Sequence, residues 1–557
     1  MQDVCVGPAV GRLTPRCLGA RRLDLLHEML ESTAAARPGA PALTDRSGTL
    51  TYEQLVAAVQ AAASGLIGLG LEKGDRVAIW LPKRREKVIA IYAAMRAGGI
   101  AVPANSALKA PQVGHVLRDS GARMLVTTAA RAADLAREAP DLGSLAALVT
   151  VDGSPSQAVT RVVVCGWDQL VRAPPKLAPG VTDTDVAALF YTSGSTGKPK
   201  GVVLSHRNMA AGARSVASYL CNTPEDRLLA ILSFGFDYGF SQLSTAFAVG
   251  ASVVLLDYML PQEVMLTLER ERITGLAAVP PIWIQLAELR WPKGARETLR
   301  YITNSGGAMP LATLTRLREA LPRTRVFLMY GLTEAFRSTY LPPEELDRRP
   351  DSIGKAIPGA EVLVLRPDGT PCDADEPGEL VHRGMLVSLG YWRDPVGTAE
   401  RFRPLPPAIP GATPPELAAW SGDIVRRDAE GFLYFIGRRD DMIKTSGYRV
   451  SPTEVEEEAY ATGLVRDAVA VGVPHERLGQ AIVLVASAPA GIADDTEALV
   501  NALRRRLPRH MVPVAVDWRD SLPRSANGKF DRARLRRELS VSFEGNEPEQ
   551  AGPLPGT

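Results

Sequence analysis

Hydrophobic positions along the first 330 residues alternate between the spacing of helices and the short apolar runs of strands. GDRVAIWLP (residues 74–82) and IAVPA (100–104) have strand-like runs, and KVIAIYAAMRAGG (87–99), between them, has the spacing of a helix that ends on glycine. Similar apolar runs recur at residues 123–128, 251–257 and 325–330. This alternation predicts an α/β protein in which helices cover parallel sheets.

The pattern changes after residue 350. AEVLVLRPDGTPC (360–372) predicts a strand, an Asp-Gly turn and a second strand, and GFLYFIGR (431–438) predicts another alternating strand. We therefore expect a β-rich subdomain that completes a large N-terminal domain of helix-covered sheets, residues 1–437.

A small C-terminal α/β domain is expected over residues 438–557. Its pattern predicts a helix at TEVEEEAYAT, strands at DAVAVGVP and QAIVLVAS, and a second helix at TEALVNALRRRL. Residues from about 544 onward are rich in Pro, Gly and Glu, which favours a disordered tail.

Composition narrows the function classes. With 557 residues the chain is too long for one core, and its formal charge of +2 gives no electrostatic case for a nucleic-acid partner. Five widely spaced cysteines without a CxxC pair suggest neither a disulfide framework nor a zinc site. Apolar runs are shorter than the ~20 residues of a membrane helix, and the N-terminus lacks a signal-peptide pattern. We expect a cytoplasmic protein with no membrane partner.

A glycine-rich loop, TSGSTGKPKG (192–201), follows the buried-strand pattern of residues 186–191. Backbone N–H groups, hydroxyls and lysines of such a loop suit a polyphosphate. The spacing of Gly194 and Gly197 differs from a Walker motif, and a flexible surface loop is the alternative. The segment VVLSHRNM after it predicts the start of a helix at His206. The candidate phosphate-binding residues are Thr192, Ser193, Gly194, Ser195, Thr196, Gly197 and Lys200.

Six segments together resemble one known family. They are YTSGSTGKPKGVVLSHRN, NSGGAMP (304–310), YGLTE (330–334), WSGDIV (420–425), GRRDDMIKTSGYRVSPTEVE (437–456) and PRSANGKFDR (523–532). In this order they resemble the signatures of the adenylate-forming, or AMP-binding, superfamily of acyl-CoA synthetases, adenylation domains and luciferases. FDYGFSQL, AVPPIWIQLAE and MYGLTEAFRSTYLPPEE are most similar to exosortase-associated acyl-CoA ligases and free-standing amino-acid-activating ligases.

The resemblance implies an ATP-dependent acid–thiol ligase. Such an enzyme adenylates a carboxylic acid with release of pyrophosphate and then transfers the acyl group to a pantetheine thiol. No domain bearing a phosphopantetheine is evident after Arg532, so we expect the thiol of CoA or of a separate carrier protein, and both remain open. A luciferase-like oxidation is the less favoured alternative, because nothing in the sequence supplies an oxidation site.

The resemblance also assigns the residues around ATP and Mg²⁺. Lys529, just after the Asn527-Gly528 turn signal, becomes the catalytic lysine, although alone it would be an ordinary turn lysine. Thr333 is a phosphate contact and Glu334 a Mg²⁺ ligand, although Glu334 alone could be a helix acid. The remaining nucleotide residues are Gly306, Gly307, Ala308, Tyr330, Gly331, Asp423 and Arg438, with a hinge at Asp440 and a thiol tunnel at Gly447.

The identity of the acid substrate is the part of the function that the sequence determines least. Asp237 matches the position that binds a substrate ammonium in amino-acid adenylation domains, but it could equally cap a helix. Arg337 matches a pocket-lining position, but it could pair with Glu334. If both face the pocket, we expect an aspartate-like or β-amino dicarboxylic acid; a non-amino carboxylic acid is the alternative. The other expected walls are Tyr238, Ser241, Ala278, Thr303, Ser305, Met329 and Ser338.

Overall fold

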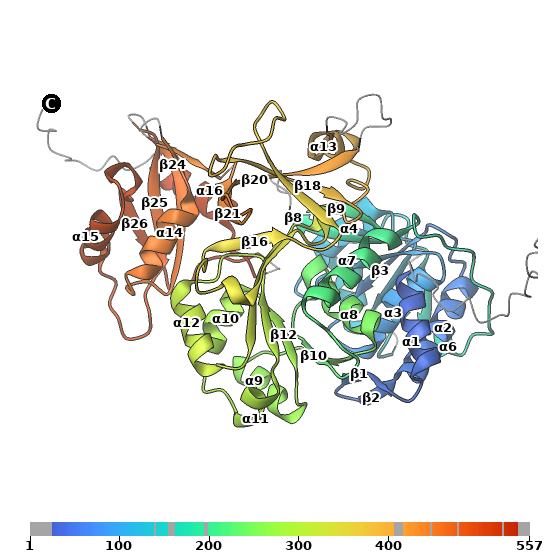
Figure 1. Ribbon diagram of the computed structural model, residues 1–557. Coiled ribbons are helices and arrows are strands. Elements are labelled where there is room, and N and C mark those ends of the chain that lie inside the picture. The colour runs from blue at the N-terminus through green and yellow to red at the C-terminus, as the bar shows by residue number, and fades with distance from the viewer. Residues whose placement is uncertain are drawn as a thin grey trace, which may run out of the picture.

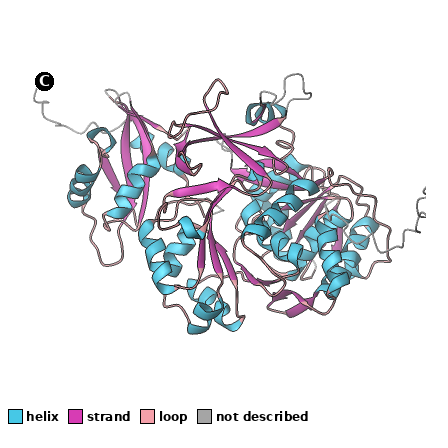
Figure 2. Ribbon diagram, in the orientation of Figure 1, coloured by secondary structure: helices cyan, strands magenta, loops and turns pink. Residues whose placement is uncertain are grey.

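The computed structural model contains three β-sheets. It describes residues 25–138, 141–153, 162–193, 199–405, 416–439, 441–445, 448–475, 478–525 and 528–543. Two sheets, of seven and 14 strands, belong to the N-terminal part, and the five-stranded sheet belongs to the C-terminal part. Helices surround the strands of the N-terminal part, whereas the region of β16 to β21 is mostly strands and loops (Figure 2).

The seven-stranded sheet has the order β7-β6-β5-β3-β4-β8-β9, parallel except for its last pair. Its strands are β3 (Arg76–Trp80), β4 (Ile100–Pro103), β5 (Met124–Thr127), β6 (Ala147–Thr150), β7 (Val163–Gly166), β8 (Val186–Ser193) and β9 (Pro199–Ser205). Its helices are α2 (Tyr52–Gly68), α3 (Arg85–Arg96), α4 (Ala110–Ser120), α5 (Ala129–Glu138), α6 (Trp167–Val171) and α7 (His206–Tyr219). Strands β3, β4 and β5 are buried almost throughout, which explains their continuous apolar runs.

The helix predicted to begin at His206 is present, but a strand that was not predicted separates it from the glycine-rich loop. Strands β8 and β9 pair antiparallel on the two sides of the loop, and α7 begins only at His206. Ser205 caps α7 by accepting a hydrogen bond from the Asn208 amide, so the hydroxyl fixes where the helix begins. His206 is buried against His27, with ring centroids 5.7 Å apart.

The 14-stranded sheet is parallel across β11-β10-β12-β13-β14 and antiparallel beyond β14. Its strands are β1 (Pro41–Asp45), β2 (Gly48–Thr51), β10 (Arg227–Ala230), β11 (Ser252–Leu255), β12 (Gly275–Ala278), β13 (Tyr301–Asn304), β14 (Arg325–Tyr330), β15 (Thr339–Leu341), β16 (Ser352–Ala356), β17 (Ala360–Leu365), β18 (Gly378–Gly384), β19 (Phe402–Pro404), β20 (Leu417–Arg427) and β21 (Leu433–Arg438). Its helices are α1 (Leu26–Ala36), α8 (Asp237–Val249), α9 (Pro261–Arg270), α10 (Pro280–Ala287), α11 (Lys293–Thr298), α12 (Leu311–Ala320) and α13 (Pro395–Arg401).

The expected β-rich subdomain is formed by β16 to β21, but the predicted hairpin over residues 360–372 is only half right. Strand β17 and the turn at Gly369 are present, and residues 370–372 make one isolated bridge, Leu365 to Pro371, instead of a strand. Pro371 has no N–H to donate to a ladder. Strand β18 pairs with β17 instead.

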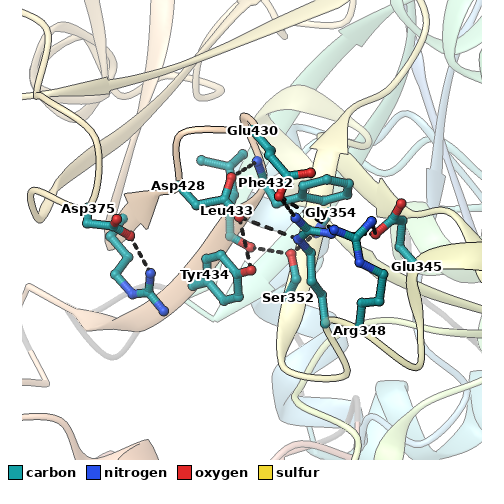
Figure 3. A network of polar contacts seen from close by, with 12 residues as sticks. Glu345, Arg348, Ser352, Gly354, Asp375, Asp428, Glu430, Phe432, Leu433 and Tyr434 are labelled. Atoms are coloured by element: carbon teal, nitrogen blue, oxygen red, sulfur yellow. Dashed lines mark hydrogen bonds and ion pairs between the residues drawn. The ribbon is translucent and has the colours of Figure 1, made fainter.

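An ion-pair network fixes the start of β21 (Figure 3). Arg349 Nη1 contacts Glu345 Oε2 at 2.5 Å, its Nη2 contacts Glu430, and its Nε lies 3.5 Å from Asp428 Oδ2. The guanidinium also lies 4.2 Å from the centroid of the Phe432 ring. Because Arg349 is buried and has several carboxylate partners, the network holds β21 in place beside β16 and β20.

The C-terminal sheet joins β22 (Ile443–Thr445), β23 (Tyr448–Val450), β24 (Asp467–His475), β25 (Gly479–Ser487) and β26 (Ala515–Trp518). Its helices are α14 (Pro452–Ala461), α15 (Thr496–Arg506) and α16 (Arg532–Phe543). Alternate residues of β24 and β25 enter two separate apolar clusters, one on each face of the sheet. The small C-terminal α/β domain is therefore confirmed, and Figure 1 shows it beside β16 and β21, away from β1 and β2.

No helix among the described residues is long and apolar enough to cross a membrane. The described cysteines, Cys165, Cys221 and Cys372, are free thiols.

Candidate active site

The predicted site residues gather at the carboxyl ends of three neighbouring parallel strands. Ala278 ends β12, Ser305 follows β13, and Gly331 follows β14. The carboxyl edge of a parallel sheet is where α/β proteins bind ligands, because loops from adjacent strands converge there. Gly306, Gly307 and Ala308 lie in the loop after β13, where Asn304 Nδ2 donates a hydrogen bond to the Gly307 carbonyl at 3.0 Å.

Lys529 enters this edge from the C-terminal domain. Its Cε lies 3.4 Å from the point where a Cβ on Gly306 would stand, and Gly306 has φ of +83°. The lysine follows a tight turn in which the Gly528 amide donates to the Ser525 carbonyl and the Ser525 amide donates to the Lys529 carbonyl. The structure thus brings Lys529 and the expected adenine loop together, and Asn527 lies outside the described residues.

Three carboxylates of the N-terminal domain act on the Lys529 ammonium. Desolvation by the surrounding protein lowers the pKa of Lys529 below its usual range. Asp237 is the strongest of the carboxylates that oppose this shift, followed by Asp423 and Glu334. The three carboxylates favour the charged form of the lysine, whereas desolvation disfavours it.

Tyr330, Asp423 and Arg438 form one hydrogen-bonded group. The Tyr330 hydroxyl donates to Asp423 Oδ2, and Arg438 Nε donates to Oδ1 at 2.9 Å. Asp423 and Arg438 are partners in the β20–β21 register, so the two strands fix their separation. Burial, reinforced by the Asp423 charge, raises the pKa of Tyr330 well above its usual range, which keeps its hydroxyl a donor.

Thr333 and Glu334 lie in a short 3₁₀ turn, Thr333–Ala335, after β14. The Glu334 carboxylate accepts a hydrogen bond of 2.6 Å from the Tyr391 hydroxyl, and Arg401 Nε lies 3.5 Å from the same oxygen. Sequence reasoning missed Tyr391 and Arg401. Both come from a distant part of the chain, and an isolated Tyr or Arg carries no spacing signal.

Only the two ends of the glycine-rich loop are described. Thr192 pairs with Lys200 in the β8–β9 register, and the Lys200 ammonium makes a 2.8 Å ion pair with Asp394. Lys200 Nζ also lies 5.4 Å from the ring centroid of Tyr391, the partner of Glu334. The Ser193 side chain, residues 194–198, Asp440 and Gly447 lie outside the described parts of the chain.

Asp237 is the first residue of α8, and no cap hydrogen bond from its side chain defines that helix start. Instead its Oδ1 accepts a hydrogen bond of 2.7 Å from the Thr333 hydroxyl. Burial raises the pKa of Asp237, and the nearby Arg337, Thr333 and Lys529 oppose that rise. The helix-cap interpretation therefore loses support, and Asp237 lies between the expected acid and phosphate regions.

Arg337 is buried, with 1% of its surface exposed. Its Nη1 donates to Ser305 Oγ at 3.1 Å, and its guanidinium lies 4.7 Å from the Tyr238 ring centroid. Within the described structure, Nε and Nη2 have no hydrogen-bond partner. The alternative pairing with Glu334 is wrong, because Phe336 (φ +56°) redirects the chain after the 3₁₀ turn and Glu334 contacts Tyr391 and Arg401 instead.

The remaining predicted walls surround Tyr238. Its hydroxyl bonds to Thr303 Oγ1 at 2.7 Å and donates to the Ala278 carbonyl at 3.3 Å, while Ser241 Oγ donates to the Tyr238 carbonyl. Behind them lies a cavity of about 30 Å³, lined also by Met329, which has room for about one water molecule. Ser338 is turned toward His382, to whose Nδ1 its hydroxyl is hydrogen-bonded at 2.9 Å.

Comparison with known proteins gives consistent matches over nearly the whole chain. Residues 30–392 match the model of the AMP-binding enzyme family, and residues 454–529 match that of the AMP-binding enzyme C-terminal domain. The chain is 34% identical to an L-proline–[L-prolyl-carrier protein] ligase of Streptomyces coelicolor, across 90% of this chain and 94% of the relative. It is 32% identical to a feruloyl-CoA synthase of Amycolatopsis, across 91% and 97%.

A similar solved structure is that of o-succinylbenzoate coenzyme A synthetase from Bacillus subtilis in complex with ATP and magnesium ion. It aligns with a TM-score of 0.77 and 28% identity, covering 91% of this chain and 98% of that one.

Proposed function

This chain belongs to the AMP-binding enzyme family and is an AMP-forming acid–thiol ligase, and we propose that it adenylates a short amino or dicarboxylic acid before passing the acyl group to a pantetheine thiol. The single observation that carries the assignment of roles is the position of Lys529 against Gly306, at the carboxyl edge of β13. The expected resemblance to adenylate-forming enzymes is confirmed by the family models and the relatives.

In the first half-reaction, an oxygen of the acid attacks the α-phosphorus of ATP, and the bond to the departing pyrophosphate breaks. Both reactants are anions, so positive charge at the meeting point lowers the barrier. A cation 4 Å from the developing charge contributes roughly 4 kcal/mol at an effective dielectric of 20, which is about a thousandfold in rate. Lys529 would supply this charge as an ammonium, with no proton transfer.

Tyr330, Asp423 and Arg438 would hold the nucleoside. The Asp423 carboxylate can accept hydrogen bonds from the two ribose hydroxyls, and Arg438 fixes its orientation from the neighbouring strand. The Tyr330 ring at the end of β14 would face the adenine, next to Gly306, Gly307, Ala308 and Gly331.

Glu334 fits a magnesium ion that is shared with phosphate. Among the described residues no group of three or more His, Cys, Asp or Glu side chains could hold a metal, which disfavours a metal site made by the protein alone. Mg²⁺ bound to nucleotides takes one or two carboxylates plus phosphate oxygens. Glu334 would be that carboxylate, oriented by Tyr391, and the cation would supply neutralising charge for the phosphates. Thr333 and residues 192–200 would contact the phosphates directly.

In the second half-reaction, a pantetheine sulfur attacks the acyl carbonyl and AMP leaves. We place the boundary of the C-terminal domain at residue 438, with Asp440 as the hinge and Gly447 beside the path of the thiol. Rotation there would withdraw Lys529 after adenylation, so that one site serves both steps. The relatives include ligases for a carrier protein and for CoA, so either thiol is a candidate acceptor.

Two observations bear on the acid. Asp237, buried at the start of α8 and facing the site, supports an acid with an ammonium group, as the amino-acid ligases among the relatives also do. The feruloyl-CoA synthase among the relatives favours the second candidate, a non-amino carboxylic acid. A long fatty acyl chain is disfavoured, because the cavity behind Tyr238 and Thr303 is only about 30 Å³.

The test is a screen of amino, dicarboxylic, aromatic and fatty acids by acid-dependent exchange of pyrophosphate into ATP. Mass spectrometry then compares the product formed on CoA with that formed on a carrier protein. We expect exchange with short acids and a thioester on one of the two thiols. If none of the acids in the panel gives AMP, the proposed function is refuted.

A further inference from the structure

Arg337 is a buried cation whose hydrogen-bonding capacity is mostly unused. A guanidinium has five N–H donors, and within the described structure only Nη1 has a partner, the Ser305 hydroxyl at 3.1 Å. Nε and Nη2 are enclosed and unpaired. Leaving charged donors unsatisfied in a protein interior costs several kcal/mol, so such a group implies a ligand that completes it.

No neighbouring carboxylate completes it. Asp237 influences Arg337 electrostatically, but no ion pair within 4 Å joins the two among the described side chains, and Asp237 Oδ1 is already bonded to Thr333. Glu334 is occupied by Tyr391 and Arg401. The positive charge of Arg337 therefore remains available at the acid end of the site.

The guanidinium is held in one orientation. Tyr238 lies under it at 4.7 Å, and the Tyr238 hydroxyl is fixed by Thr303. Ser305 holds the opposite edge, since its hydroxyl accepts the Nη1 bond. A planar guanidinium supported by an aromatic ring and a hydroxyl presents its free N–H groups as a fork that matches a carboxylate.

Arg337 and Lys529 both act on the Asp237 carboxylate, and their contacts lie on adjacent residues of one loop. Arg337 bonds to Ser305, and Lys529 lies against Gly306, the next residue, whose Cα is about 3.8 Å away. The cavity of about 30 Å³ behind Tyr238 is too small for a long chain. A molecule between the two cations would have its reacting carboxylate near Lys529 and a second group at Arg337.

From these observations we infer that Arg337 is a specificity-determining residue that receives a second anionic group, a carboxylate, on a short acid whose other carboxylate is activated. This inference rests on the proposed function, because it assumes that the acid binds at this edge. Asp237 would act beside it on an ammonium, so the two residues would select different groups of the same substrate.

Matched acids test the inference. The best substrate of the screen is compared with its distal monoamide. Two fixed series are measured as well. The first is aspartate, asparagine and 2-aminobutyrate, and the second is succinate, succinamate and butyrate. Each amide keeps the shape of the acid and removes the distal charge. We expect kcat/KM for pyrophosphate release to fall at least about a hundredfold from the diacid to its monoamide, because a buried charged site rejects a partner that leaves it unpaired.

Variants at the site separate this role from a structural one. Arg337→Gln should lower kcat/KM for the diacid by about a hundredfold, while KM for ATP stays within about threefold of the parent. The same variant should reduce the preference for diacid over monoamide to a few-fold. Arg337→Lys should restore part of the preference. Ser305→Ala, which removes only the support of Nη1, should lose less than Arg337→Gln.

A binding measurement covers the case in which Arg337 variants fold poorly. The Lys529→Ala protein keeps Arg337, and its melting temperature should rise more with the diacid than with the monoamide. If the best acid carries no second anionic group, or the monoamide works as well as the diacid, a buried water satisfies Arg337 and the inference is wrong while the ligase function stands. If no acid yields pyrophosphate, the proposed function itself fails.

Discussion

The Thr333 hydroxyl donates a hydrogen bond to Asp237 Oδ1 across 2.7 Å, which joins the turn after β14 to the first residue of α8. The proposed phosphate contact and the proposed acid contact are therefore neighbours in direct contact. A change on the nucleotide side should alter how the acid binds.

Thr333→Val tests this connection. Removing the hydroxyl leaves the buried Asp237 carboxylate with one fewer donor, a loss of roughly 1.5–3 kcal/mol for a hydrogen bond to a charged group. We expect kcat/KM for the acid to fall by about tenfold to a hundredfold, in addition to any effect on ATP, when pyrophosphate release is measured against acid concentration. Thr333→Ser keeps the hydroxyl and should stay within about threefold of the parent. An effect of Thr333→Val on ATP alone would contradict the connection.

Lys529→Ala should separate the two half-reactions. Adenylation should fall by about a thousandfold, since the cation at the meeting point of two anions is gone. Thioester formation from a supplied acyl-adenylate should be nearly unchanged, because that step does not bring two anions together. Pyrophosphate release measures the first step and thioester yield the second. The neighbouring turn variant Ser525→Ala is the control, and equal losses in both steps would rule out this division.

Glu334→Gln should raise the Mg²⁺ concentration needed for half-maximal adenylation by about tenfold or more, since a neutral amide is a much weaker ligand for a hard cation. Tyr391→Phe leaves the carboxylate and removes only the 2.6 Å hydrogen bond that orients it, so its effect should be smaller and in the same direction. Titration of activity with Mg²⁺ at fixed ATP measures both. An unchanged Mg²⁺ requirement in Glu334→Gln would remove Glu334 from the metal site.

The buried pair His27 and His206 should make the fold sensitive to acid. Desolvation by burial is the main cause that lowers the pKa of His27 to about 3 and that of His206 to about 4. The unfolded chain takes up these protons near pH 6.5, before the folded chain does. Stability is therefore full above about pH 6.5 and falls as the pH drops toward 4, by up to about 1.4 kcal/mol for each histidine per pH unit.

Urea unfolding between pH 7.5 and 5 measures this slope. His27→Phe should make the slope shallower, and because His27 Nδ1 has no hydrogen-bond partner, no bond is lost with it. If His27→Phe and the parent lose stability in parallel, the acid sensitivity has another source.

The sequence predicted the parallel core well and its connections less well. The runs at β3, β4 and β14 are buried on both faces, so local hydrophobicity sufficed to identify them. Strand β9 was not predicted, because its short apolar run VVLS is followed at once by a helix start and its pairing with β8 depends on a loop closure. Residues 370–372 were predicted as a strand, but Pro371 among them has no N–H to donate to a sheet.

For the site, the residues in contiguous motifs could be predicted and their partners could not. Tyr330, Asp423 and Arg438 form one hydrogen-bonded group, and the charges of Asp423 and Arg438 act on Lys529, but the roles that the resemblance gave these residues stay predictions. The contacts of Arg337 follow from the positive φ of Phe336, a backbone feature that an aromatic residue gives no reason to expect. Tyr391 and Arg401 reach Glu334 only through the tertiary fold.

Strand β21 ends at Arg438, and the C-terminal sheet begins at Ile443, with only four residues between them. Fully extended, that segment spans at most roughly 18 Å. In any orientation of the C-terminal domain, its first strand therefore stays within this distance of β21, the strand that carries Arg438. In the proposed rotation, this short connection would keep Lys529 at a high effective concentration near the nucleotide and would limit how far the domain moves away.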